Sequence, residues 1–334
     1  MPDTKKMMKK EAEVPGERDE SHVTGGLFRH LSPLSWGAGR KPAEKPPRQK
    51  SLMELDEAGA LDADRVVFDN TEKDYRGVYP PYEMGIYCRR GSKHERREVD
   101  NQDYALIIPS VKLMSGVEAR VVGVFDGISS HPTAGYDSQA AAHSLIRFVL
   151  DNGSRYEDPV KLAIDALAKM SADIRDNYAE VKKYPPVRDI ASKILDPRDG
   201  PGTTTTFAIL LEGKAVIAHL GDSRAYIQDA HGNVSQVTAD QKDEIGFLTL
   251  HVGRVEPKGD DVSQFVNAVD YNPKTDTFIL ATDGAYARMS THNIGGLIEK
   301  NRQKGAQMIS EEMGIRGRSE TKDDATAIVI LPKK

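Results

Sequence analysis

Aspartate residues recur in this chain where short apolar runs begin or end. The run Val121–Phe125 leads into an Asp-Gly pair at Asp126, and the run Phe278–Thr282 leads into a second pair at Asp283. A short apolar run that stops at a turn signal is typical of a buried strand. One such aspartate is most simply a turn residue. Its recurrence favours a site, because a carboxylate at the end of a core strand is held rigidly.

Further aspartates adjoin other apolar runs. Asp222 follows the run 215–220, Asp103 precedes 104–108, and Asp323 and Asp324 precede 325–331. Strands that carry carboxylates at their ends can bring them together at one edge of a sheet. Clustered carboxylates repel one another unless cations neutralise them. Oxygen ligands suit hard ions such as Mg²⁺ or Mn²⁺, so the sequence predicts a divalent metal site.

Composition narrows the class of protein. The chain has 334 residues, enough for one large domain or two small ones, and a net charge of −5 that gives no case for nucleic-acid binding. Its single cysteine, Cys88, excludes an intrachain disulfide and a cysteine zinc site, and it favours the reducing cytoplasm. No apolar run has the length of a transmembrane helix, so we expect no membrane association.

The chain divides into a tail and a domain. Residues 1–75 contain scattered prolines and charges with little periodicity, which predicts a poorly ordered N-terminal tail before a domain at 76–334. Short apolar patches interrupt the tail at 26–28, 31–36 and 52–55. These patches are either incidental or dock on the domain or on a partner.

Strands and helices alternate irregularly in the domain. We expect strands at 84–89, 104–108, 119–126, 202–211, 214–220, 225–228, 234–237, 265–269, 278–282 and 325–331. Helical spacing of apolar residues predicts helices at 134–149, 159–174, 293–302 and 306–313, with a short helix near 190–195. Hairpins dominate the middle of the chain, which indicates an α+β fold with antiparallel sheets.

Six motifs in order resemble the PPM family of metal-dependent protein phosphatases, also called type 2C. They are 101–103 (Asn-Gln-Asp), 126–127 (Asp-Gly), 202–204 (Gly-Thr-Thr), 221–224 (Gly-Asp-Ser-Arg), 282–284 (Thr-Asp-Gly) and 323–326 (Asp-Asp-Ala-Thr). The resemblance covers roughly residues 84–332. The stretch from Ile128 to His131 after the first Asp-Gly is more similar to the bacterial subgroup. It lacks the histidine that follows Asp-Gly in the eukaryotic subgroup as a proposed acid.

The resemblance implies an α-β-β-α sandwich, in which two antiparallel sheets pack face to face with helices on both outer sides. It also implies hydrolysis of phosphoserine and phosphothreonine in phosphoprotein substrates, with Mn²⁺ or Mg²⁺. A water activated by two metal ions would attack phosphorus, and the same ions would neutralise the phosphoryl oxygens.

Five of the six motifs imply a metal-binding role. Asp126 would bridge two ions with help from the Gly127 carbonyl, Asp103 would hold the second ion, Asp283 and Asp323 the first, and Asp222 a weak third. The family often has a further aspartate where this chain has Ala287, which weakens the third site.

A guanidinium would help to position the phosphoryl group. Arg97 is our candidate for this catalytic role, with Arg96 beside it. The family arginine precedes the first-motif aspartate by five residues, whereas Arg97 precedes Asp103 by six. The alternative is that these arginines belong to a solvated run of charges from Lys93 to Glu98.

Two other functions compete with a protein phosphatase. A pseudophosphatase would keep the fold as a binding module, but it would be expected to lose metal aspartates, and the four principal positions are all aspartate here. A two-metal hydrolase of a small phosphorylated metabolite would share the same chemistry, since selectivity lies in the loops.

Overall fold

The computed structural model describes residues 67–69, 75–79, 82–131, 133–181, 202–254 and 261–333. All of them belong to one unit, Pro46–Lys334. The apolar patches expected in the tail and the short helix expected near 190–195 lie outside the described residues.

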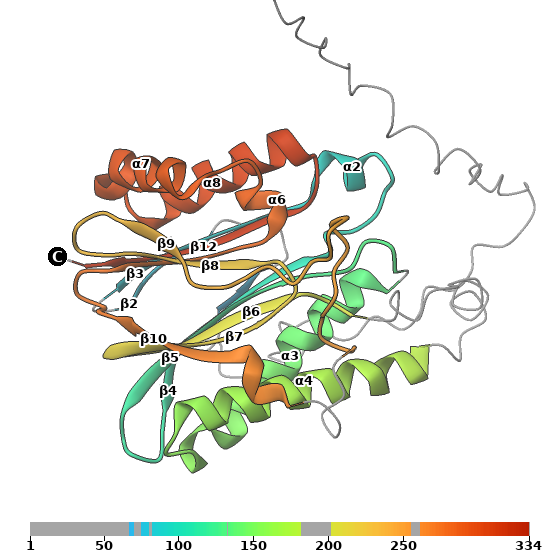
Figure 1. Ribbon diagram of the computed structural model, residues 1–334, viewed down its shortest axis with the longest axis horizontal. Helices are drawn as coiled ribbons and strands as arrows, with labels where there is room; N and C mark the ends of the chain where they lie inside the picture. The colour runs from blue at the N-terminus through green and yellow to red at the C-terminus, as the bar shows by residue number, and fades with distance from the viewer. Residues whose placement is uncertain are drawn as a thin grey trace, which may run out of the picture. The chain divides into compact units, whose positions relative to one another are not determined.

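Two antiparallel sheets form the centre of this unit (Figure 1). The first sheet has the order β1 (Val67–Asp69), β4 (Asp103–Lys112), β5 (Glu118–Asp126), β6 (Thr205–Leu211), β7 (Gly213–Leu220) and β10 (Val266–Tyr271). The second has the order β2 (Tyr75–Tyr79), β3 (Tyr82–Arg89), β12 (Ala325–Pro332), β11 (Thr277–Ala281), β8 (Arg224–Gln228) and β9 (Val234–Gln236). β1 lies inside the segment that the sequence assigned to the tail, so the sheet begins before the predicted boundary at residue 76.

Helices cover the outer face of each sheet (Figure 1). α3 (Ala134–Asn152) and α4 (Pro159–Val181) pack on the first sheet. α7 (Thr291–Asn301) and α8 (Ala306–Thr321) pack on the second, together with the short α6 (Asp283–Tyr286). One turn of helix, α2 (Ser92–Glu95), follows β3, and short 3-10 turns lie at Gly153–Arg155, Val262–Phe265 and Arg302–Lys304. This arrangement is the predicted α-β-β-α sandwich.

Three apolar layers hold the sandwich together, and β4 shows how one strand serves two of them. Leu106 and Ile108 pack toward α3 and α4, whereas Ile107 between them packs toward the other sheet. Successive side chains of a strand point to opposite faces. β4 is buried on both faces, so it appears in the sequence as a continuous apolar run rather than an alternating one.

α8 continues eight residues beyond its predicted end at Met313. The apolar pattern stops there because two glycines, Gly314 and Gly317, replace large residues on the buried face. A Cβ on Gly314 would lie 2.0 Å from the ring of Tyr87, and one on Gly317 would lie 2.3 Å from the carbonyl oxygen of Gly284. The helix therefore approaches the sheet at Gly314 and α6 at Gly317 through small residues, which carry no signal in a hydrophobic pattern.

The fold places several carboxylates at one end of the two sheets. Asp103, the first residue of β4, is the register partner of Asp126, the last residue of β5. In the second sheet, Asp283 follows the end of β11, and Asp323 precedes the start of its neighbour β12. Antiparallel pairing thus places the start of β4 beside the end of β5 in the first sheet, and the start of β12 beside the end of β11 in the second.

The layer beneath α3 and α4 depends on Phe207, whose side chain is fully buried in β6. We expect Phe207→Ala to lower the free energy of unfolding by about 3–5 kcal/mol, because the lost apolar contacts leave a cavity. Phe247→Ala, which removes a side chain that is 64% exposed, should change it by less than about 0.5 kcal/mol. Urea denaturation of both variants tests this, and equal losses would contradict the assignment of Phe207 to the core.

Candidate metal centre

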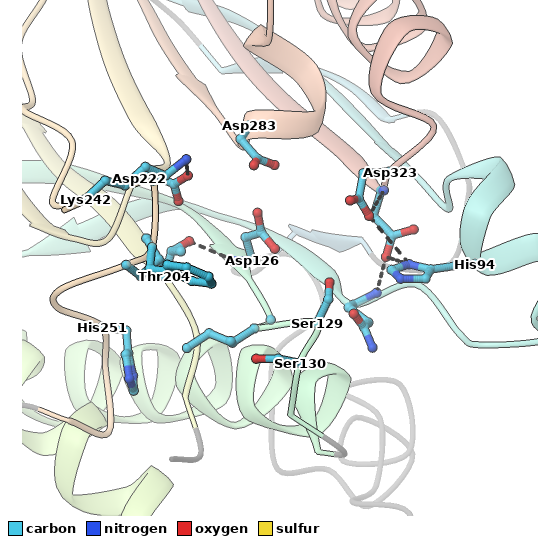
Figure 2. Close-up of a pocket in the computed structure, with 17 residues that line it drawn as sticks. His94, Asp126, Ser129, Ser130, Thr204, Asp222, Lys242, His251, Asp283 and Asp323 are labelled. Carbon is cyan, nitrogen blue, oxygen red and sulfur yellow. Dashed lines mark hydrogen bonds and ion pairs between the residues drawn. The ribbon is translucent and has the colours of Figure 1, made fainter. Parts of the chain in front are cut away.

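Side chains from both sheets line one cavity of about 430 Å³ at this end of the sandwich (Figure 2). Its lining comprises His94, Gln102, Asp126, Gly127, Ile128, Ser129, Ser130, Thr204, Asp222, Lys242, Gly246, Phe247, Leu248, His251, Asp283, Asp323 and Asp324. Four of the predicted metal-binding aspartates are among them. The fifth, Asp103, is fully buried beside Asp126 in the sheet.

These aspartates are close enough to disfavour one another's charge. Burial raises the pKa of Asp126 well above its ordinary value, and the charges of Asp103, Asp283, Asp222 and Asp323 raise it further. Burial likewise raises the pKa of Asp103, with Asp324 and Asp283 adding to the effect. The pKa of Asp283 rises to about 6, from burial first and then from Asp222 and Asp323. Bound cations would stabilise the charged form of these carboxylates, and the oxygen donors fit Mn²⁺ or Mg²⁺.

Both Asp-Gly pairs require glycine for a close approach of two backbones. A Cβ at Gly127 would lie 2.3 Å from the carbonyl oxygen of Ala134, and one at Gly284 would lie 1.7 Å from that of Asp324. Any larger residue would push apart the segments that carry the carboxylates. The glycines therefore set the spacing of the site.

Threonine hydroxyl groups fix the inner aspartates. The amide of Asp126 donates to Oγ1 of Thr204 at 3.2 Å, and its carbonyl oxygen accepts from the amide of Thr204 and from Oγ1 of Thr203, both at 2.8 Å. Oγ1 of Thr282 donates to Oδ2 of Asp103 at 2.8 Å. This last bond joins the two sheets across the cluster. The Gly-Thr-Thr motif thus supports the strand end that presents Asp126.

The structure distinguishes the adjacent Asp323 and Asp324. Asp324 is buried and accepts from the amides of Gly91 at 2.6 Å and Gln102 at 2.7 Å, while its Oδ2 lies 2.9 Å from Nδ1 of His94. Asp324 therefore braces the loops beside the cavity. The side chain of Asp323 is 32% exposed and lies 3.1 Å from Nζ of Lys93. Asp323 is therefore the more accessible of the two carboxylates, and it lines the cavity.

Asp222 lines the cavity from the loop between β7 and β8, and contacts with two side chains hold it there. The hydroxyl of Tyr286 donates to its carbonyl oxygen at 2.9 Å, and Nζ of Lys242 lies 2.5 Å from its Oδ2. Nearby, Arg224 makes two bonds of 2.8 and 2.7 Å to Asp240 and stacks 4.0 Å above the ring of Tyr286. Arg224 thus tethers this loop.

Arg97 is the predicted catalytic residue that the structure does not bring to the cavity. Its side chain is exposed in the turn after α2 and is not part of the lining. The short helix α2 at 92–95 directs the charged residues that follow it toward solvent. Arg97 therefore belongs to a solvated run of charges, the alternative that the sequence also offered. His131 is also outside the lining; it is buried next to Thr133, and burial lowers its pKa to about 4.

Sequence reasoning missed two lining residues that bear on the chemistry, His94 and Lys242. His94 lies inside a run of charges, where nothing separates it from a surface residue. Lys242 is surrounded by polar residues in a segment without periodicity. Only the folded chain shows that both side chains turn toward the aspartates (Figure 2).

The family model for protein phosphatase 2C matches residues 90–311, more than half of the chain. The chain belongs to the protein phosphatase 2C family. A curated relative, "Probable protein phosphatase 2C 28" of Arabidopsis thaliana, is 26% identical over 284 residues, covering 74% of this chain and 76% of the relative. This confirms the family and the function class predicted from the six motifs, a metal-dependent phosphoprotein phosphatase.

Solved structures of bacterial phosphatases share the fold of this 2C phosphatase. The serine/threonine phosphatase PstP/Ppp of Mycobacterium tuberculosis has a TM-score of 0.54 at 17% identity, covering 76% of this chain and 99% of that structure. The PstP catalytic domain in complex with two manganese ions gives 0.54 at 18%, covering 76% and 99%. The S. agalactiae serine/threonine phosphatase gives 0.56 at 14%, covering 75% and 100%.

Among the described helices of this phosphatase, none combines the length and the apolar character needed to cross a membrane.

The charge of Asp126 should destabilise the metal-free phosphatase, because its pKa is raised on folding. A carboxyl with a raised folded pKa stabilises the fold below the unfolded value, near pH 4, and that stability is lost as the pH rises. In EDTA, we therefore expect the free energy of unfolding of Asp126→Asn to rise relative to that of the parent as the pH rises from 4 to 7.5. The gain should reach at least about 1.4 kcal/mol, which corresponds to one pKa unit.

Urea denaturation at several pH values measures this difference. Asp176→Asn, at an exposed position of α4, is the control and should show no such pH-dependent gain. A constant difference between Asp126→Asn and the parent across this range would contradict the repulsion that we assign to the cluster.

Proposed function

We propose that this chain hydrolyses phosphoserine and phosphothreonine monoesters of proteins by attack of water, using two divalent cations, Mn²⁺ or Mg²⁺. One observation carries the proposal: Asp126, Asp283 and Asp323 adjoin two different sheets and line one cavity, and Asp103 is buried directly beside Asp126. Clustered carboxylates repel one another and destabilise the fold unless cations are bound. The family to which the chain belongs consists of phosphatases.

The roles follow from position. Asp126 is central to the cluster and would contact both ions, with the Gly127 carbonyl beside it. Asp103 would hold the ion on the side of the first sheet, and Asp283 and Asp323 the ion on the side of the second. Divalent cations bound here would supply an activated water and neutralise charge on the phosphoryl group.

The protein itself contributes rigidity. Hydrogen bonds with Thr203, Thr204 and Thr282 fix the backbone or carboxylate of the inner aspartates, so that the ligands are arranged before a substrate binds. No serine or cysteine nucleophile is needed for this reaction. Cys88 is fully buried in β3 and is therefore not a nucleophile in this proposal.

A third ion at Asp222 would be weak. Ala287, at the end of α6, offers no carboxylate, and Asp222 already has the ammonium of Lys242 at 2.5 Å. We propose two functional ions.

A protein substrate is favoured over a small metabolite by the edge of the cavity. Ile245 and Phe247 are 78% and 64% exposed, and Phe247 is part of the lining. Large apolar side chains exposed beside a polar cavity are typical of a surface that contacts another chain.

A pseudophosphatase is disfavoured because the four principal aspartates are present and lie close together. We also propose a cytoplasmic location, and docking of the N-terminal tail on a partner stays a prediction.

Catalysis should depend strictly on a divalent cation. We expect phosphate release from a phosphothreonine peptide in Mn²⁺, loss of that activity in EDTA, and its return with Mn²⁺ or Mg²⁺. Asp126→Asn should lower kcat by at least about a thousandfold, because it weakens both ion sites, whereas Asp176→Asn should not. Full activity of the parent in EDTA would refute the two-ion proposal, and its inactivity in Mn²⁺ would favour a pseudophosphatase.

Phe247 should matter more for peptides than for small esters. We expect Phe247→Ala to lower kcat/KM for a phosphothreonine peptide several-fold more than for p-nitrophenyl phosphate, because only the peptide extends over the exposed ring. The loss of one apolar contact corresponds to about 1–3 kcal/mol at most. Equal losses on the two substrates would remove this support for a protein substrate.

A further inference from the structure

A cation of the protein near the phosphoryl group would help to position it, and Arg97 is not in place to provide this cation. Lys242 is the only lysine or arginine among the described residues that line the cavity. Lys93 lies on the other flank, 3.1 Å from Asp323, but it does not contribute to the lining.

The backbone at Lys242 is secured by its two preceding residues. The amide of Gln241 donates to the carbonyl oxygen of Gly221, and Oε1 of Gln241 accepts from the amide of Gly221, both at 2.8 Å. The carboxylate of Asp240 accepts two hydrogen bonds from the guanidinium of Arg224. This pairing ties the segment 240–242 to the loop that carries Asp222. Lys242 thus enters the cavity from a fixed base rather than from a free loop.

The ammonium of Lys242 has capacity beyond its ion pair. Its Nζ lies 2.5 Å from Oδ2 of Asp222, and Figure 2 shows the pair on one side of the cavity, with Asp126 and Asp283 also facing the opening. An ammonium has three N–H donors, and one is sufficient for this carboxylate. The side chain is 32% exposed and lines the cavity, so a ligand bound in the cavity can contact it.

We propose that Lys242 contacts the phosphoryl group of the substrate, keeping one N–H on Asp222 and donating the others to phosphoryl oxygens. Asp222 then serves chiefly to aim this ammonium rather than to bind an ion. The inference rests on the proposed function, since it names the protein group that binds the same phosphoryl group. Lysine binds phosphate as a point charge, so it needs none of the planar geometry of the arginine expected from the sequence.

The test uses Lys242→Met and measures binding of inorganic phosphate to the Mn²⁺-loaded protein by titration calorimetry. We expect the Kd for phosphate to rise about 10- to 100-fold, the size of one lost charge-assisted hydrogen bond. KM for a phosphothreonine peptide should rise in parallel. The Kd for Mn²⁺ at the two tightest sites and the number of ions bound should stay unchanged.

Two further variants make the result specific. Lys242→Gln can still donate to Asp222 and so preserves the fold if Lys242→Met does not, yet it lacks the charge and should show the same weakened phosphate binding. Lys161→Met is the matched control, since Lys161 is also paired with an aspartate, Asp165 at 3.2 Å, but lies on α4. It should leave phosphate and Mn²⁺ binding unchanged.

Unchanged phosphate affinity in both Lys242 variants would overturn the inference. If that result came with an additional bound Mn²⁺, Lys242 would be only the counter-ion of Asp222. Because phosphate binding is measured without turnover, this failure is distinct from failure of the proposed function, which would appear as an inactive parent protein in Mn²⁺.

Discussion

Mutual repulsion among buried carboxylates is the constraint on which the rest of this molecule depends. Burial and the charges of four neighbouring aspartates raise the pKa of Asp126, so the fold holds negative groups together against their preference. A flexible loop would relax by moving them apart. Here the carboxylates adjoin strands of two sheets whose faces are locked by a continuous apolar core, and the chain cannot relieve the repulsion without losing that core.

The polar structure around the cluster is a consequence of this constraint. Hydroxyl groups of threonines bond the strand ends that carry Asp126 and Asp103, and Asp324 uses its carboxylate to join the segments at Gly91 and Gln102. These bonds restrain backbone and side chains, while Asp126, Asp283 and Asp323 still line the cavity. Rigid support of this kind allows a cluster to favour metal binding over local rearrangement.

Charge is distributed unevenly across the cavity. The two outer aspartates, Asp323 and Asp222, have lysines at 3.1 and 2.5 Å, whereas repulsion is concentrated on the inner Asp126 and Asp103. A cation would therefore relieve the most repulsion at the centre, where the Asp126 carboxylate is close to four other aspartates. The exposed Ile245 and Phe247 adjoin this charged cavity, so one opening combines a polar interior with an apolar edge.

The sequence by itself determined which residues could form the site and what class of fold would carry it. Apolar runs that end at Asp126 and Asp283, and those that begin after Asp103 and Asp323, are local signals, because strand burial and turn chemistry are properties of a few consecutive residues. The ordered motifs added the family and the α-β-β-α arrangement, which the sheet topology matches. The helix stripes likewise predicted α3 and α4.

Only the tertiary structure decided which of these side chains contact one another and which of them line the cavity. Lys242 meets Asp222 across 20 positions and Asp324 meets Gly91 across 233, contacts set by sheet pairing and loop packing rather than by any local pattern. For the same reason the sequence placed Arg97 at the site, whereas the turn after α2 directs it outward, and it ended α8 at Met313, where glycines replace the apolar stripe. Side-chain direction over long separations depends on the packed fold, and a one-dimensional pattern does not contain it.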